Sequence, residues 1–158
     1  EMANYLDISG KSSVAGQGRL PKLRGQINPI TTITANTTLY DYDSGSVYFL
    51  DGSGVEDAIL NVTLPSAKAG LYFKFILKAI GNEAAEDITI TQAASTEDFV
   101  GHIIDGAGTS DTATSSDTKI IFDQSANAAP GDYVCLHCDG TNWYVQGACG
   151  TAGDVVFG

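Results

Sequence analysis

The sequence predicts an all-β protein: an antiparallel β-sandwich or jelly-roll-like single domain that follows an extended N-terminal arm. Three observations lead to this fold class. The chain has 158 residues, the size of one domain. Short apolar runs alternate with polar residues at a period of two, and turn residues separate these runs roughly every 8–12 residues. Leu-, Ala- and Glu-rich windows that would favour helices are missing.

The predicted arm comprises residues 1–30, which show neither the period of a strand nor that of a helix. Pro21 and Pro29 interrupt it, and its glycines make it less regular still. We expect it to become ordered only against another surface. Half of the eight basic residues of the chain lie in it. They are Lys11, Arg19, Lys22 and Arg24. They indicate either an exposed polar arm or an arm that docks on an acidic partner surface.

Residues 31–149 form the predicted sandwich domain, and residues 150–158 a C-terminal tail. Leu60, Val62 and Leu64 alternate with polar residues, as in a strand buried on one face. The most apolar run, Gly70–Lys78, indicates a central strand. The segment Asp105–Ser116 reads as a long polar loop. Further strands are expected at 31–34, 46–50, 87–91, 99–104, 119–122, 132–138 and 143–146.

The clearest local signal is a hairpin at Asp139-Gly140, between the apolar runs 132–138 and 143–146. Gly accepts a positive φ without steric cost, so Asp-Gly between two strands predicts a tight turn. Trp143 and Tyr144 are adjacent and must point to opposite faces. We expect one ring to anchor the core and the other to cover an edge or meet a neighbour.

Three motifs follow one another along the chain. They are an Asp-Ser-Gly turn, a Thr-Leu-Pro segment that leads into Gly-Leu-x-Phe-x-Phe, and a Gly-Asp-Tyr-Val strand followed by Asp-Gly-Thr-Asn-Trp-Tyr-Val. They occupy Asp43–Gly45, Thr63–Phe75 and Gly131–Val145. In this order they resemble structural proteins of tailed-bacteriophage particles. The resemblance covers about residues 39 to 147 and departs from the pattern at Cys135, His137 and Cys138. The arm before it has no counterpart.

The resemblance implies a capsid decoration or cement protein, made in the host cytoplasm and located in the virion. Its partners would be the major capsid protein and further copies of itself, and a trimer would suit a three-fold position on a shell. The alternative is a tail-fibre module that binds a receptor or carbohydrate. Exposed aromatic side chains would then make the contacts, and Tyr40, Tyr42 and Trp143 are the candidates.

Composition narrows the list of partners. The formal net charge of −11 repels phosphates, so no nucleic-acid partner is expected. No stretch of eighteen apolar residues is present, so no membrane span is expected either. The N-terminus lacks the apolar region of a signal peptide, and Met2 resembles a native start, with Glu1 a remnant before it.

Cys135, His137 and Cys138, with Cys149 downstream, suggest a zinc site. Strand alternation argues against one, because Cys135 and His137 would face one side and Cys138 the other. The strand pairing would also place Cys149 opposite Asp132. A bulge could restore the geometry, and an intermolecular disulfide is a further alternative. We expect free, half-buried thiols, with no metal and no cofactor.

No enzymatic activity is expected. The two histidines, His102 and His137, stand in no known catalytic motif. Adjacent carboxylates such as Glu97-Asp98 would point to different sides, and no feature nominates a glycosidase pair. The sequence therefore predicts no catalytic residue.

Overall fold

The computed structural model describes residues 30–54, 59–81, 87–125 and 128–158. The predicted arm therefore lies outside the described residues, apart from Ile30. The same is true of the basic side chains Lys11, Arg19, Lys22 and Arg24, so their predicted docking role stays a prediction.

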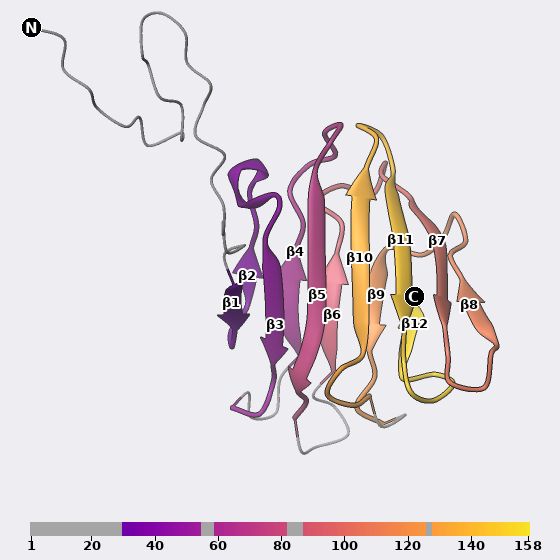
Figure 1. The fold of residues 1–158 in the computed structure, drawn as a ribbon. Coiled ribbons are helices and arrows are strands. Elements are labelled where there is room, and N and C mark those ends of the chain that lie inside the picture. Colours follow the sequence, from indigo (N-terminus) through magenta and orange to yellow (C-terminus); the bar gives the residue numbers. More distant parts are fainter. Residues whose placement is uncertain (1–29, 55–58, 82–86, 126–127) are drawn as a thin grey trace, which may run out of the picture.

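The described chain forms strands and one short 3-10 helix, Asp41–Asp43. The strands are β1 (Ile30–Ile33), β2 (Thr37–Thr38), β3 (Val47–Asp51), β4 (Leu60–Thr63), β5 (Tyr72–Ala79), β6 (Ile88–Thr91), β7 (Phe99–Ile104), β8 (Ser110–Thr112), β9 (Lys119–Phe122), β10 (Tyr133–Cys138), β11 (Trp143–Ala148) and β12 (Val155–Phe157). They make a seven-stranded sheet in the order β1-β3-β5-β10-β11-β7-β8 and a five-stranded sheet in the order β12-β9-β6-β4-β2 (Figure 1).

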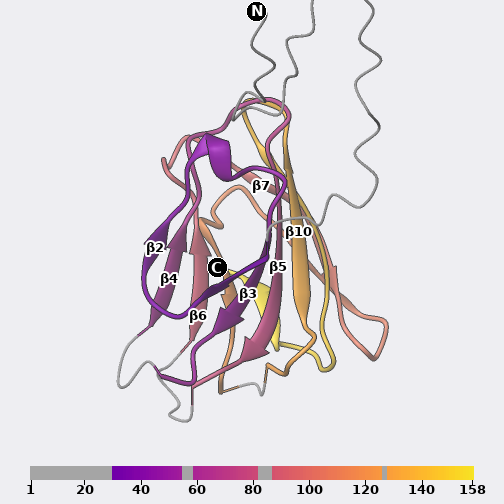
Figure 2. The ribbon, with the colours of Figure 1, turned by 60° about the vertical axis from the view of Figure 1, so that its left-hand side comes forward.

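The two sheets pack face to face, with β2, β4 and β6 in one layer and β3, β5 and β10 in the other (Figure 2). Alternate residues of each strand point into the core between them, as the burial pattern of β5 shows. Phe73, Phe75 and Leu77 of that strand are buried against Leu60 and Val62 of β4 and their neighbours in one core cluster. The predicted all-β sandwich is confirmed.

The pairing of strands differs from the prediction of an antiparallel, jelly-roll-like sandwich. Half of the strand pairs are parallel: β1 with β3, β3 with β5, β2 with β4, β4 with β6, and β7 with β11. The reason is the path of the chain. From β1 to β6, successive strands alternate between the two sheets. Every second strand therefore lies in the same sheet and runs in the same direction. Local alternation of apolar residues carries no information on this path.

The predicted hairpin is confirmed as β10 and β11, which pair antiparallel with Cys138 opposite Trp143. The Asp139 side chain closes the turn, because its Oδ1 accepts the backbone N–H groups of Thr141 and Asn142, each at 2.8 Å. Gly140 has a φ of 105°, a left-handed conformation that costs glycine little.

Two segments predicted to be irregular contain strands. Residues 105–116 include β8, which pairs with β7. The predicted C-terminal tail, 150–158, includes β12, which pairs with β9 and extends the five-stranded sheet. Val155 is 1% exposed, and Phe157 lies 6.3 Å from Phe99, ring centre to ring centre. The sandwich thus continues to Phe157, because these apolar side chains close its core at that edge.

Candidate functional site

The candidate site is the outer face of the seven-stranded sheet, the side that points away from the five-stranded sheet. We define this outer face by the strand residues that alternate with the core positions. They are Val47, Phe49 and Asp51 of β3, Tyr72, Lys74, Ile76 and Lys78 of β5, Tyr133, Cys135 and His137 of β10, Tyr144, Gln146 and Ala148 of β11, and Val100, His102 and Ile104 of β7.

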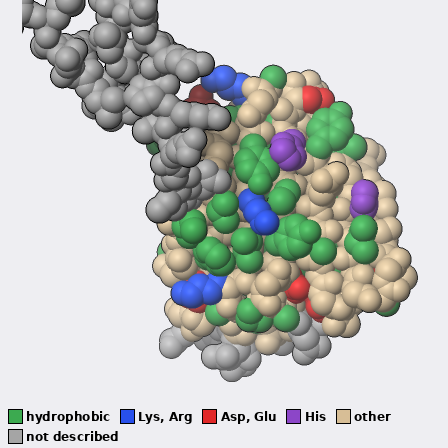
Figure 3. Space-filling model, viewed as in Figure 1, with side chains coloured by type: hydrophobic (Ala, Val, Ile, Leu, Met, Phe, Trp, Pro, Cys, Tyr) green, Lys and Arg blue, Asp and Glu red, His purple; other side chains and the backbone are tan. Residues whose placement is uncertain are grey.

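The outer face is rich in apolar and aromatic side chains. Hydrophobic side chains gather over the middle of the sheet on this side of the molecule (Figure 3). Val100, Ile104 and Tyr144 are 38%, 45% and 45% exposed, and the register aligns Ile104 with Ala148. The face therefore presents a broad apolar surface to solvent rather than isolated apolar side chains.

Aromatic and cationic side chains on the outer face contact one another across strands. The Tyr72 and His137 rings lie on paired residues of β5 and β10, with centres 4.6 Å apart. The ammonium group of Lys74 lies 4.9 Å from the centre of the Tyr133 ring, which is within the range of a cation–π interaction. The middle of the face is thus held in a defined arrangement by its own side chains.

Charge is distributed unequally between the outer face and the rest of the molecule. The described residues contain four lysines and thirteen carboxylates. Two of these lysines, but only one carboxylate, that of Asp51, belong to the outer face. The remaining described surface and loops hold two lysines and twelve carboxylates. The strands of the five-stranded sheet contain no carboxylate at all, so the acidic groups of the described chain lie mainly in its loops and turns.

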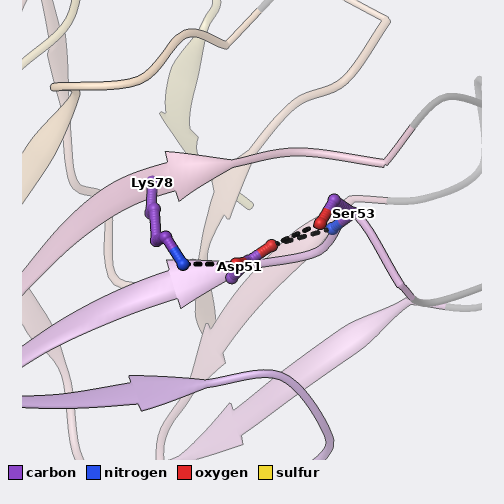
Figure 4. Close-up of polar contacts among 3 residues, drawn as sticks. All are labelled: Asp51, Ser53 and Lys78. Carbon is purple, nitrogen blue, oxygen red and sulfur yellow. Dashed lines mark hydrogen bonds and ion pairs between the residues drawn. The ribbon is translucent and has the colours of Figure 1, made fainter.

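Asp51 is held in place at one end of this face by β5 and by its own turn (Figure 4). Its Oδ1 accepts hydrogen bonds from the hydroxyl and the N–H of Ser53, at 2.6 and 3.2 Å. Its Oδ2 lies 2.9 Å from Nζ of Lys78. The hydrogen bond from the Ser53 hydroxyl, followed by that from Lys78, lowers the pKa of Asp51. The only carboxylate of the outer face is thus neutralised locally.

A second feature is a cleft of about 530 Å³ at one end of the five-stranded sheet. The strands β2, β4 and β6 run parallel, and the cleft lies just beyond their carboxyl ends. Tyr40 lines it and stacks on Tyr42, with ring centres 5.3 Å apart. Asp41 and Lys68, which also line it, form an ion pair at 3.0 Å. This pair lowers the pKa of Asp41. The cleft thus combines an aromatic wall with a neutralised ion pair.

The three residues predicted as aromatic surface contacts differ in their exposure to solvent. Tyr40 and Tyr42 are exposed at 52% and 78%, as a surface role requires. Trp143 is fully buried, so its prediction as a surface contact is wrong. Because side chains alternate along a strand, the adjacent residues Trp143 and Tyr144 point to opposite sides. Trp143 faces the core beside Phe73, and Tyr144 lies on the outer face. Tyr144 is thus the exposed ring of the hairpin.

The cysteines follow the alternation predicted for them. Cys135 lies half-buried on the outer face, whereas Cys138 and Cys149 are buried, and all three are free thiols. The N–H of Gly150 donates to Asp132, which places the end of β11 opposite Asp132 as expected. Within the described ranges, no three His, Cys, Asp or Glu side chains are placed to hold a metal ion.

Two buried carboxylates cap turns at the far end of the sandwich. Asp132 accepts the N–H groups of Ala129 and Gly150, at 2.8 and 3.0 Å. Asp154 is 1% exposed; its Oδ2 accepts the N–H of Thr151, and its Oδ1 has no hydrogen-bond partner among the described residues. Burial is the main cause that raises the pKa of Asp154, and the nearby charge of Asp132 adds to it.

No family model matches the chain, and neither the curated proteins nor the solved structures contain a match. No helix in the described part of the chain is long and apolar enough to cross a membrane.

Proposed function

We propose that this chain is a structural protein of a virus particle, specifically a capsid decoration or cement protein. The observation that carries the proposal is the outer face. Single soluble proteins rarely expose contiguous apolar patches of this kind, which mark contact surfaces. A protein that reinforces a shell acts through broad, ordered contacts and needs no catalytic group, cofactor or metal. The three ordered phage-like motifs support the same conclusion.

In this proposal the major capsid protein is the principal partner and further copies of the chain are the second. The arm, with Lys11, Arg19, Lys22 and Arg24, reaches an acidic surface of a neighbouring capsid subunit. The protein is made in the host cytoplasm and acts in the virion. The acidic body supports the expectation that nucleic acid is not a partner.

The cleft favours a second candidate function, that of a receptor- or carbohydrate-binding module in a tail fibre. The stacked Tyr40 and Tyr42 rings offer an exposed apolar surface against which a sugar ring could pack. The Asp41–Lys68 pair offers both an acceptor and donors for hydroxyl groups. A concave, mainly apolar site with a few polar groups is the usual form of a small-ligand site.

The position of the protein in the particle distinguishes the two functions. Electron cryomicroscopy of particles with and without the protein should show density lost from the outer shell, together with lower heat stability. Loss of density at the tail, with unchanged shell stability and lost adsorption to the host, would overturn the decoration proposal.

The carbohydrate alternative has its own test, a glycan array probed with the full chain. Binding that is lost in Tyr40→Ala and Tyr42→Ala would support it. Tyr144→Ala is the matched control, because Tyr144 is similarly exposed but lies on the outer face, away from the cleft. An array without binders would count against this alternative.

A further inference from the structure

We infer that residues 19–24 of the N-terminal arm dock in the cleft at the end of the five-stranded sheet of their own chain before the protein assembles. The arm lies outside the described residues, whereas every residue that lines the cleft is described. The proposed function gives the cleft of a decoration protein no role. This docking supplies a role that belongs to the isolated protein and does not depend on the particle.

The turn beside the cleft combines exposed aromatic rings with carboxylates. Its residues are Tyr40, Asp41, Tyr42 and Asp43, and the two rings stack with centres 5.3 Å apart. The Asp43 carboxylate accepts the N–H of Tyr40 at 2.9 Å and is thereby held beside the rings. Lys68 pairs with Asp41, but Asp43 has no ion-pair partner among the described residues. The turn thus keeps one uncompensated negative charge next to two tyrosine rings, a setting that suits a cation.

Residues 19–24 have a composition that matches this turn and the cleft. Their sequence is Arg-Leu-Pro-Lys-Leu-Arg, which supplies three cations, two leucines and a proline. Proline favours the extended polyproline II conformation, and such peptides dock in aromatic-lined grooves. A guanidinium group can stack on a tyrosine ring and also bind a carboxylate. Leu20 and Leu23 fill the apolar part of the cleft, whose volume of about 530 Å³ is ordinary for a ligand site.

Charge favours this occupant over a neutral sugar. A sugar leaves Asp43 without a counter-ion, whereas an arginine or a lysine pairs with it. The described residues hold four lysines and thirteen carboxylates, so the body attracts a basic segment. Half of the basic residues of the chain lie in the arm, and three of those four belong to residues 19–24.

The chain enters the body close to the cleft. Ile30 is paired with Val47, which follows Asp43 by four residues. With about 4.8 Å between paired strands and about 3.6 Å per residue, Asp43 is at most about 20 Å from Ile30. The extended chain from Arg24 to Ile30 spans up to about 21 Å, so the segment reaches the turn. A short tether gives an effective concentration on the order of millimolar, which favours the segment of the same chain over that of a neighbouring copy.

The cleft and a shell compete for the same cations. Arg19, Lys22 and Arg24 cannot bind the cleft and an acidic capsid surface at the same time. The cleft therefore holds the arm until a shell offers a more strongly acidic surface.

Limited trypsin digestion of the full chain tests the docking, because trypsin cleaves after lysine and arginine. Lys22 and Arg24 lie in the docked segment, and Lys11 lies outside it as an internal reference. The cleavage rates, followed by mass spectrometry, are divided by those of a synthetic peptide of residues 1–29, which has the same sites without the body. We expect cleavage after Lys22 and Arg24 to be slowed by about tenfold or more relative to Lys11.

Variants of the turn should remove this protection. Asp43→Asn keeps an acceptor for the N–H of Tyr40 but removes the charge, so cleavage after Lys22 should become fast. The double variant Tyr40→Ala with Tyr42→Ala should have the same effect, whereas Tyr40→Phe keeps the ring and should keep the protection. Tyr144→Ala is the matched control, because its exposed ring lies on the outer face. Melting curves would verify that each variant is folded.

Salt and protein concentration separate this contact from its alternatives. Protection should fall between about 0.05 and 0.5 M NaCl, because ions screen the cations from Asp43. It should be equal at about 1 and 100 μM protein, because a contact within one chain does not depend on concentration. Protection that appears only at the higher concentration would assign the segment to a neighbouring copy and overturn docking within the chain.

Three further results would refute the docking. They are equal corrected rates at Lys11 and Lys22, protection that survives Asp43→Asn, and protection that does not change with salt. None of these results bears on where the protein sits in a particle, which microscopy decides separately.

Discussion

The indole Nε1 of Trp143 donates a hydrogen bond to Oε2 of Glu97, 3.1 Å away and 46 residues apart in the sequence. The other oxygen of Glu97 accepts the N–H of Ala67 at 2.8 Å. Glu97 is 7% exposed, so both bonds lie inside the protein. One carboxylate thereby links the hairpin strand β11 to the loops that follow β4 and β6.

Glu97→Ala should lower the free energy of unfolding by about 2–4 kcal/mol, because it leaves the buried indole N–H and the Ala67 N–H without acceptors. Denaturation in urea, followed by Trp143 fluorescence, would measure this loss. Glu97→Gln keeps one acceptor oxygen and should cost less. Equal stability of Glu97→Ala and the original chain would contradict the role given to this carboxylate.

Gly101 should tolerate no side chain. Its φ is 146°, and a Cβ there would lie 1.9 Å from the carbonyl oxygen of Val145 on the paired strand β11. Gly101→Ala must push β7 and β11 apart, and we expect a loss of more than about 3 kcal/mol or a chain that does not fold. Gly108→Ala is the control, since Gly108 also has a positive φ but has open space around it. A thermal melt of both variants tests the difference.

Asp154→Asn should stabilise the protein at neutral pH, by on the order of 1 kcal/mol, because it removes a buried charge whose Oδ1 has no hydrogen-bond partner in the described part of the chain. Burial raises the folded-state pKa of Asp154 above its usual 3.8. The folded protein thus holds this proton more tightly than the unfolded chain. The free energy of unfolding therefore falls as pH rises from about 3.8 through the folded-state pKa. In Asp154→Asn, the free energy of unfolding measured from pH 3 to pH 8 should no longer show this decrease. A variant less stable than the original at pH 7 would refute the argument.

Asp51→Asn should have the opposite pH signature. The pKa of Asp51 is lowered, so its stabilising effect is present above about pH 4 and is lost as pH falls through the folded-state pKa. At neutral pH we expect a loss of about 0.2–1 kcal/mol, the size of a surface ion pair, because Lys78 is half-exposed. Asp41→Asn is the comparison, since both members of its ion pair are exposed. A larger effect of Asp41→Asn would overturn this ranking.

Local signals in the sequence were sufficient for most of the strands, but not for β8 and β12 and not for the arrangement of the strands. The alternation around Leu60 and Val62 and the Asp139-Gly140 turn identify β4 and the hairpin, because each depends on neighbouring residues only. Whether β3 pairs with β5 in parallel depends on which sheet the chain enters between them. That choice is made by packing across the core, which no local pattern records.

The candidate site was predicted only in part. The sequence predicts Tyr40 and Tyr42 as exposed rings, yet the cleft that Tyr40 lines is formed by three chain segments that come together only in the fold. The outer face was missed, although the run from Tyr72 to Lys78 carried its signal: it is apolar at both odd and even positions. Trp143 was assigned to the wrong side because a hairpin alone does not say which of its faces is buried.

The parallel pairing of β7 with β11 has a consequence for how the chain folds. Phe99 of β7 is aligned with Trp143 of β11, so β7 cannot complete its pairing until the last hairpin has formed beside it. Strand pairs this distant in sequence carry a high entropic cost of loop closure and slow the folding of β proteins. We therefore expect the seven-stranded sheet to close late, after synthesis has passed residue 148, with β10 and β11 as the template on which the earlier strands assemble.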